Sequence, residues 1–141
     1  MNTTELQRRL LEEGCSPHNF SIGSRGSDVF CLEQRDGVWR VFYTERGQDS
    51  PPILESKRED EACEFFFHYI TTKIRHDHLV GFFVFEQRAI HLESQLVQHG
   101  ILCHLDKIPY GGWSDPRYRV FVVGKDIFKA RALLGEIPLK D

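Results

Sequence analysis

The sequence predicts an α+β fold in which two small halves pack together through one shared central helix. Residues 56–75 have the pattern of a helix whose apolar residues spread over more than one side, so this helix needs cover from two directions. Residues 1–78 form an expected α-β-β-β-α half, and residues 79–141 an expected β-α-β-β-α half of ferredoxin-like character. The 141 residues suffice for one compact unit made of both halves.

The central helix is predicted from its capping signal and its apolar spacing. Ser56 and Glu59 have the spacing of a capping box, and the acidic residues that follow suit the positive end of the helix dipole. Apolar residues then recur at intervals of three and four, and others widen the stripe, so both halves are expected to cover it. The stripe comprises Ala62, Phe65, Phe66, Tyr69 and Ile70, and it is widened by Cys63, Phe67 and Ile74.

The rest of the first half is predicted from helix caps, alternating strands and a tight turn. Asn2 or Thr3 can cap an initial helix, and Gly14 can close it. Asp36-Gly37 suits a two-residue hairpin turn because both positions of such a turn need positive φ. The expected elements are a helix at 3–13, a structured loop at 15–23, strands at 29–34 and 38–45, a loop at 46–52 and a short strand at 53–55.

The second half is predicted to contain part of a split β-α-β motif. Its first strand, 79–85, is apolar on both faces and is therefore expected inside the sheet. A right-handed crossover would set this strand parallel to a neighbouring one. The expected elements that follow are a helix at 86–99, a strand at 101–108, a turn-rich loop at 109–116, a strand at 117–123 and a helix at 126–134, with Pro138 ending the regular structure.

Composition argues against several classes of protein. No apolar run has the length of a membrane span, and the start MNTTELQRRLLEEG lacks the apolar core of a signal peptide. The four cysteines contain no C-x-x-C pair. We therefore expect reduced thiols in a cytoplasmic protein without a membrane partner.

Charge is unevenly distributed along the chain. The net charge is −3, and no basic block suggests a nucleic-acid partner. Residues 1–78 hold 14 acidic and 10 basic residues, whereas residues 79–141 hold 7 and 8. The densest acidic stretch runs from Asp49 to Glu64. This stretch is either a solvated helix start or a docking surface for a basic partner.

Reactive residue types form no recognisable catalytic, cofactor-binding or metal-binding constellation in the sequence. His76-x-His78 could begin a metal site, but no third ligand is identifiable nearby. Cys15 lies near His18 without the local signature of a cysteine protease, and the other cysteines fall in core-like segments. Phosphate-binding and nucleophile motifs are also missing. We therefore expect a protein that is not an enzyme and that uses no cofactor or metal.

Aromatic residues on two strands of the second half invite comparison with an RNA-recognition sheet. The charge and the missing Arg/Lys-Gly-aromatic string argue against that reading. A core role is therefore expected for Phe82, Phe83 and Phe121.

The loop PYGGWSDP, residues 109–116, is the strongest local functional signal. Tyr110 and Trp113 flank two glycines in an expected surface loop, and such aromatics are typical anchors of a protein interface. The alternative is that both side chains fold back onto the core. The expected partner-binding residues are Asp49, Asp60, Glu61, Glu64, Tyr110, Trp113 and Asp115.

The strings GCSPHNFSIG, VFCLEQRDGVWRVFYTERG and EACEFFFHYI resemble a module of bacterial immunity proteins. Such proteins are encoded beside polymorphic toxins, including those of contact-dependent growth inhibition systems. The resemblance covers Leu10 to Ile70, and its most specific parts are Trp39 to Gly47 and Glu61-Ala62-Cys63. It implies a cytoplasmic, non-enzymatic protein that binds and neutralises the C-terminal domain of a cognate toxin. The acidic bias favours a nuclease as that toxin.

The second half resembles, more weakly, small bacterial ferredoxin-like modules. This likeness keeps a second hypothesis open. The chain would then be a regulatory or signalling module that binds a ligand or partner through its second half.

Overall fold

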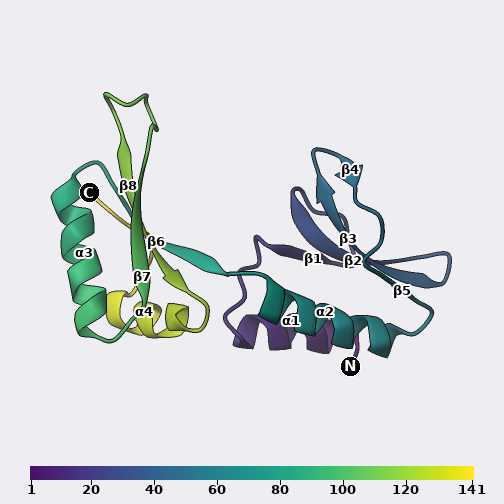
Figure 1. Ribbon diagram of the computed structural model, residues 1–141. Helices are drawn as coiled ribbons and strands as arrows, with labels where there is room; N and C mark the ends of the chain where they lie inside the picture. Colours follow the sequence, from purple (N-terminus) through teal and green to yellow (C-terminus); the bar gives the residue numbers. More distant parts are fainter. The chain divides into compact units, whose positions relative to one another are not determined.

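The protein has an α+β fold made of two compact units, as Figure 1 shows in a computed structural model of residues 1–141. The units are Met1–His76 and Asp77–Asp141, so the boundary lies two residues before the predicted one. Four helices and two mixed sheets confirm the predicted fold class. None of the helices combines the length and apolar character that crossing a membrane requires.

The first unit is a sheet with two helices. The sheet has the order β1-β2-β3-β4, and β5 pairs with β3 beside β4. The β1 and β2 strands are parallel, and the other pairs are antiparallel. The elements are α1 (Thr3–Glu12), β1 (Phe20–Ile22), β2 (Val29–Arg35), β3 (Val38–Glu45), β4 (Gln48–Asp49), β5 (Leu54–Ser56) and α2 (Glu59–Lys73).

Two tight turns shape the strands of this sheet. Asp36 and Gly37 have φ of 53° and 76°, the positive values that the predicted two-residue hairpin turn requires. Arg46 and Gly47 repeat this conformation, with φ of 51° and 75°, between β3 and β4. The sequence did not predict the second turn, because arginine rarely adopts positive φ and so gives no turn signal.

Helix α2 is the centre of the first unit's core. Its buried residues share one core with residues of α1 and of the first sheet, and Figure 1 shows the two helices next to one another along one face of that sheet. Phe66 is fully buried there and meets Phe20 edge-on, with ring centroids 6.5 Å apart. The expectation of two covers was therefore right. The first unit's own α1, however, supplies cover that was expected from the second half.

The start of α2 differs from the predicted capping box. The N-cap residue is Arg58, and it makes no side-chain cap. Ser56 Oγ accepts a hydrogen bond from the Arg58 backbone N–H at 3.0 Å, which forms a local turn. Glu59 Oε1 accepts instead from the Thr3 N–H at 3.0 Å. Glu59 thus satisfies an unpaired donor at the start of α1 and ties the two helices together.

The second unit is a four-stranded sheet with the order β7-β8-β6-β9. The β8 strand is antiparallel to both β6 and β7, so those two run in the same direction with β8 between them. This is a split β-α-β arrangement. The crossover through α3 leads from β6 to β7, which is parallel to β6 but, contrary to the prediction, is not its neighbour, because β8 lies between them. The elements are β6 (Asp77–Phe83), α3 (Glu86–Gln98), β7 (Cys103–Ile108), β8 (Arg117–Val123), α4 (Asp126–Leu134) and β9 (Leu139–Lys140).

Three short strands lie where no strand was predicted. The β1 strand lies inside the expected loop 15–23, β4 lies inside the expected loop 46–52, and β9 follows Pro138, where regular structure was expected to end. The β1 and β9 strands join their sheets in parallel, with β2 and β6 respectively, whereas β4 pairs antiparallel with β3. Such short edge strands carry too few residues for an alternating pattern to be recognised.

The core of the second unit lies between its sheet and its two helices. Val80 and Phe83 from β6 pack with Val120 and Val122 from β8 and with the buried face of α3. Side chains at alternate positions on the same strands therefore point to the other face of the sheet. None of the unit's own helices packs on that face, and the β7–β8 hairpin continues its two strands beyond the end of the sheet.

Candidate functional site

The strongest candidate site is the hairpin loop between β7 and β8, residues 109–116. Figure 1 shows it projecting beyond the helices of its unit. Tyr110 and Trp113 keep 63% and 67% of their surface exposed. The sequence left open whether these rings fold back onto the core, and the structure places both at the surface. Exposed aromatic side chains of this size are suitable interface anchors.

The loop is held in one shape by its own backbone. The Gly111 N–H donates to the Asp115 carbonyl at 2.9 Å, and the Asp115 N–H donates to the Gly112 carbonyl at 3.0 Å. Gly112 has φ of 87°, which favours glycine. A Cβ on Gly111 would lie 2.4 Å from Asp115 Oδ2, so only glycine allows the carboxylate to approach. Both glycines of the motif are therefore required by the loop geometry.

Arg117 holds the Tyr110 side of the loop in place. Its side chain is only 17% exposed, and Nη1 donates to Asp115 Oδ1 at 2.7 Å and to the Pro116 carbonyl at 3.0 Å. Its Cζ lies 4.5 Å from the centroid of the Tyr110 ring, which also meets Phe82 edge-on at 5.5 Å. Asp115, an expected partner-binding residue, is thus engaged inside the hairpin.

Lys107 provides the free positive charge of the hairpin. Its Nζ lies 5.8 Å from the ring centroids of both Trp113 and Tyr118, within reach of a cation–π attraction. It forms no salt bridge, whereas the arginines nearby are paired with Asp115 and Asp106. The sequence carries no signal for Lys107, because its charge stands out only once the nearby arginines are seen to be paired.

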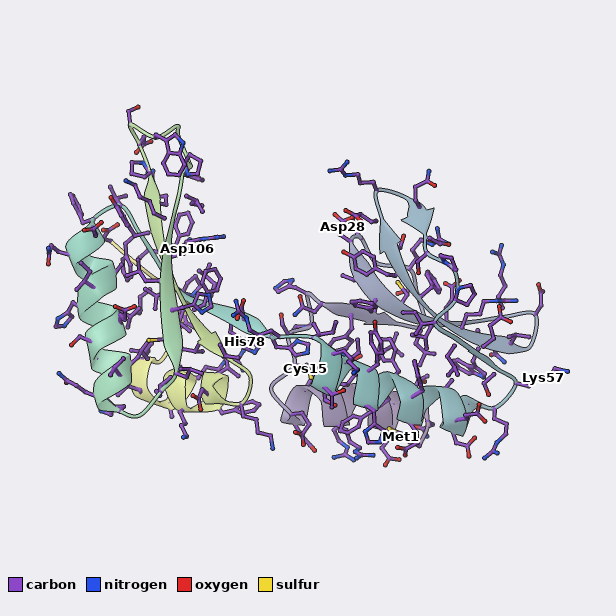
Figure 2. The ribbon with its side chains drawn as sticks, in the orientation of Figure 1. Met1, Cys15, Asp28, Lys57, His78 and Asp106 are labelled. Atoms are coloured by element: carbon purple, nitrogen blue, oxygen red, sulfur yellow. The ribbon has the colours of Figure 1, made fainter.

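The open face of the second sheet carries a second group of aromatic and charged side chains. Asp106, labelled in Figure 2, accepts two hydrogen bonds from Arg119, at 2.8 and 2.6 Å. These bonds raise the pKa of the Arg119 guanidinium. Arg119 Cζ lies 4.9 Å from the Phe121 ring centroid, and His104 stacks on the same ring at 5.1 Å.

This arrangement corrects the expected core role of two phenylalanines. Phe83 is buried among the core residues of its unit as predicted. Phe82 and Phe121 are only half-buried, and neither belongs to that core. Alternation along each strand was the signal for this difference, but a run of apolar residues hides it.

The acidic run from Asp49 to Glu64 is largely neutralised by local partners. Asp49 pairs with Arg25 at 2.6 Å, and Asp60 pairs with Arg58 at 2.7 Å. Hydrogen bonding from Arg58 also lowers the pKa of the Asp60 carboxyl. The expected site residues of this run are all exposed, but only Glu61 and Glu64 among them form no ion pair. The local field is therefore weaker than the count of acids suggests.

His76 is a structural residue rather than a metal ligand. Its ring is buried, and its Nδ1 accepts from the Ser16 backbone N–H at 2.9 Å, with the Asn19 amide 3.1 Å away. Because Nδ1 accepts, Nε2 carries the proton and donates to the Ile70 carbonyl at 2.8 Å. Both nitrogens of the ring are thus engaged within the first unit. No group of three potential ligands is placed for a metal ion.

The cysteine thiols have environments that disfavour the thiolate. Burial raises the pKa of Cys15 and of Cys63 to about 11. Burial also raises the pKa of Cys31 and of Cys103. A cysteine nucleophile needs the opposite shift, so none of these thiols resembles an activated one.

The outer face of the first sheet has an open hollow of about 460 Å³ that the sequence did not predict. Phe42 lines it together with Arg25, Arg35 and Arg40. Three acidic residues line the same hollow, so its formal charge is balanced. Its chemistry therefore does not select a cationic or an anionic ligand.

No protein-family model, curated protein or solved structure was found to match the chain. The resemblance to immunity proteins stays a prediction for that reason. Two exposed surfaces, the hairpin and the start of α2, are the candidates for binding a partner.

Proposed function

We propose that the chain is a cytoplasmic, non-enzymatic immunity protein that binds the C-terminal domain of a cognate toxin and blocks it. The observation that carries this proposal is the hairpin, which presents Tyr110 and Trp113 on a loop stiffened by hydrogen bonds. Tryptophan, tyrosine and arginine dominate the residues that anchor protein interfaces. A pre-formed loop also loses little conformational freedom on binding.

The unpaired acids of α2 support a nuclease as the toxin. Glu61 and Glu64 are three residues apart on the helix, so their exposed carboxylates lie on one side of it. A toxin that cleaves nucleic acid needs a positive groove for phosphates. Carboxylates brought into that groove would exclude the substrate, and opposite charge would speed the encounter.

Co-purification with the C-terminal domain of the toxin that this proposal expects in the neighbouring gene tests the proposal. We expect a stable complex and protection of cells that express the domain. The double variant Glu61→Lys, Glu64→Lys should associate more slowly than the wild type. This difference in association rate should shrink at high salt, because salt screens exposed charges. Glu136→Lys, which reverses one exposed acid elsewhere, shows how much a single reversal outside this surface changes the rate. Neither complex nor protection with the wild-type protein would refute the proposed function.

The half-buried rings on the open face of the second sheet favour one alternative. Phe82 and Phe121 would be available to a ligand or partner there, as a regulatory or signalling module requires. The neighbouring gene separates the two hypotheses. A large secreted toxin encoded immediately beside this chain favours immunity, whereas a transport or signalling gene there favours the module.

A further inference from the structure

We propose that the β7–β8 hairpin binds a protein surface where a carboxylate lies beside an apolar socket. Trp113 would fill the socket, and Lys107 would pair with the carboxylate. This inference deepens the proposed function and rests on it, because it states which part of the toxin domain the hairpin recognises. An acidic spot lies outside a phosphate-binding groove, so the hairpin would hold the toxin domain at a position separate from its active surface.

Charge on the hairpin identifies the partner's chemistry. Arg117 and Arg119 already have carboxylate partners at 2.7 and 2.6 Å. Lys107 has none, so the hairpin meets its partner with one uncompensated positive charge. A basic surface would repel this ammonium group. An acidic one would attract it and would guide the approach.

The rings beside Lys107 indicate that the partner's carboxylate must lie next to apolar surface. Lys107 Nζ is 5.8 Å from the Trp113 centroid, so a group that pairs with the ammonium lies within a few ångströms of the indole. Trp113 is the most exposed aromatic residue of the loop. Burying it in a socket would exclude water from the ion pair and strengthen it.

Arg117 is the positioning residue of this surface. It joins the Asp115 carboxylate to the Tyr110 ring, and the Asp115 backbone in turn holds Gly111. The guanidinium uses its planar shape for both contacts, so lysine cannot replace it. The tip should lose its fixed shape when this group is changed, while its charge stays the same.

A protein fits these features better than a single-stranded nucleic acid. Bases bind by stacking on open ring faces. On the sheet, His104 and Arg119 already lie against the Phe121 ring. The two exposed rings of the tip belong to a loop with a single uncompensated cation, which is little charge for a phosphate backbone.

Binding kinetics of single variants against the purified toxin domain test the inference. Lys107→Glu should slow association several-fold at low salt, and the difference should fade as salt rises. Trp113→Ala should speed dissociation roughly 30-fold or more, as expected for an interface anchor. Lys129→Glu makes the same charge change on an exposed lysine of α4 and should leave both rates unchanged.

Arg117→Lys separates positioning from charge. It should speed dissociation as Trp113→Ala does, and it should leave the salt dependence of association as in the wild type. In the free protein it should increase the quenching of Trp113 by acrylamide, measured with Trp39→Phe so that one tryptophan remains. Unchanged quenching and unchanged dissociation would remove Arg117 from the proposed role.

The outcomes distinguish this inference from the proposed function. A complex that forms and protects cells, but ignores Lys107→Glu and Trp113→Ala, overturns the inference and leaves the function standing. Faster association of Lys107→Glu shows a basic partner surface and also overturns it. Absence of any complex overturns both. Binding of a labelled oligothymidylate that is lost in Trp113→Ala would assign the tip to nucleic acid instead.

Discussion

Replacing Phe66 by alanine is the sharpest test of the first unit's core. Phe66 is fully buried in α2, so the substitution removes the whole ring from the core that α1, α2 and the first sheet share. Such truncations cost about 3–5 kcal/mol. The lost edge-on contact with Phe20 adds about 0.5–1.5 kcal/mol beyond area, and regular elements on both sides limit collapse of the cavity. We therefore expect a value near the upper end of the range.

Guanidinium denaturation followed by tryptophan fluorescence measures this effect. The chain has two tryptophans, Trp39 in the first unit and Trp113 in the second, so a Trp113→Phe background reports on the first unit alone. Leu11→Ala is the control. Its side chain lies on α1 but is 40% exposed, and it should cost about 1 kcal/mol or less. A loss below about 1 kcal/mol for Phe66→Ala would refute the reasoning that α2 is the core of this unit.

Three further predictions concern buried or tethered groups. His76→Ala should destabilise the first unit by about 1–3 kcal/mol, because it leaves the Ser16 N–H and the Ile70 carbonyl without partners; loss of hydrogen-exchange protection at the Ser16 amide would show this. All four cysteines should titrate as free thiols in denaturant without reductant, while Cys15 and Cys63 should react slowly at pH 8 in the folded protein; a disulfide would contradict the expected cytoplasmic location. Hydrogen bonds from the Val84 and Phe85 N–H groups lower the pKa of Asp141, so its contribution to stability is complete above the unfolded-state value of 3.8 and disappears as pH falls through the lower folded-state value. The stability difference between wild type and Asp141→Asn, measured from pH 2 to pH 7, should therefore vanish at the acidic end, and a constant difference would count against this role.

Most of the fold was predictable because its longer elements carry local signals. The β3 strand, the β8 strand and α4 have the predicted bounds, and the Asp36-Gly37 turn has the predicted conformation. The errors concern partners that sequence spacing does not reveal. Glu59 has the spacing of a capping box but bonds to Thr3, 56 residues away. The breadth of α2's apolar surface was recognised, yet nothing in the pattern tells which neighbour covers it.

The site was less predictable because pairing decides which charged groups are available. Asp49 and Asp60 contribute to an acidic run in sequence, but each has an arginine partner in the structure. Asp115 looks equally available and is held by Arg117. Conversely, no sequence pattern pointed to Lys107, although it is the one cation of the hairpin that forms no salt bridge. The turn residues around Tyr110 and Trp113 predicted a surface loop, but they left open whether the two rings fold back onto the core.

The outer edge of β7 has a consequence for handling the protein. The β7 strand ends the order of its sheet, so one side of its backbone has no strand partner and could pair with another molecule. Lysine on such a strand opposes this kind of pairing between molecules, and Lys107 is the one residue of β7 that is exposed rather than half-buried. Charge reversal at this position keeps that protection, whereas truncation to alanine removes it. Concentrated Lys107→Ala should therefore self-associate in light scattering while Lys107→Glu stays dispersed, which makes the glutamate variant the proper reagent for binding studies.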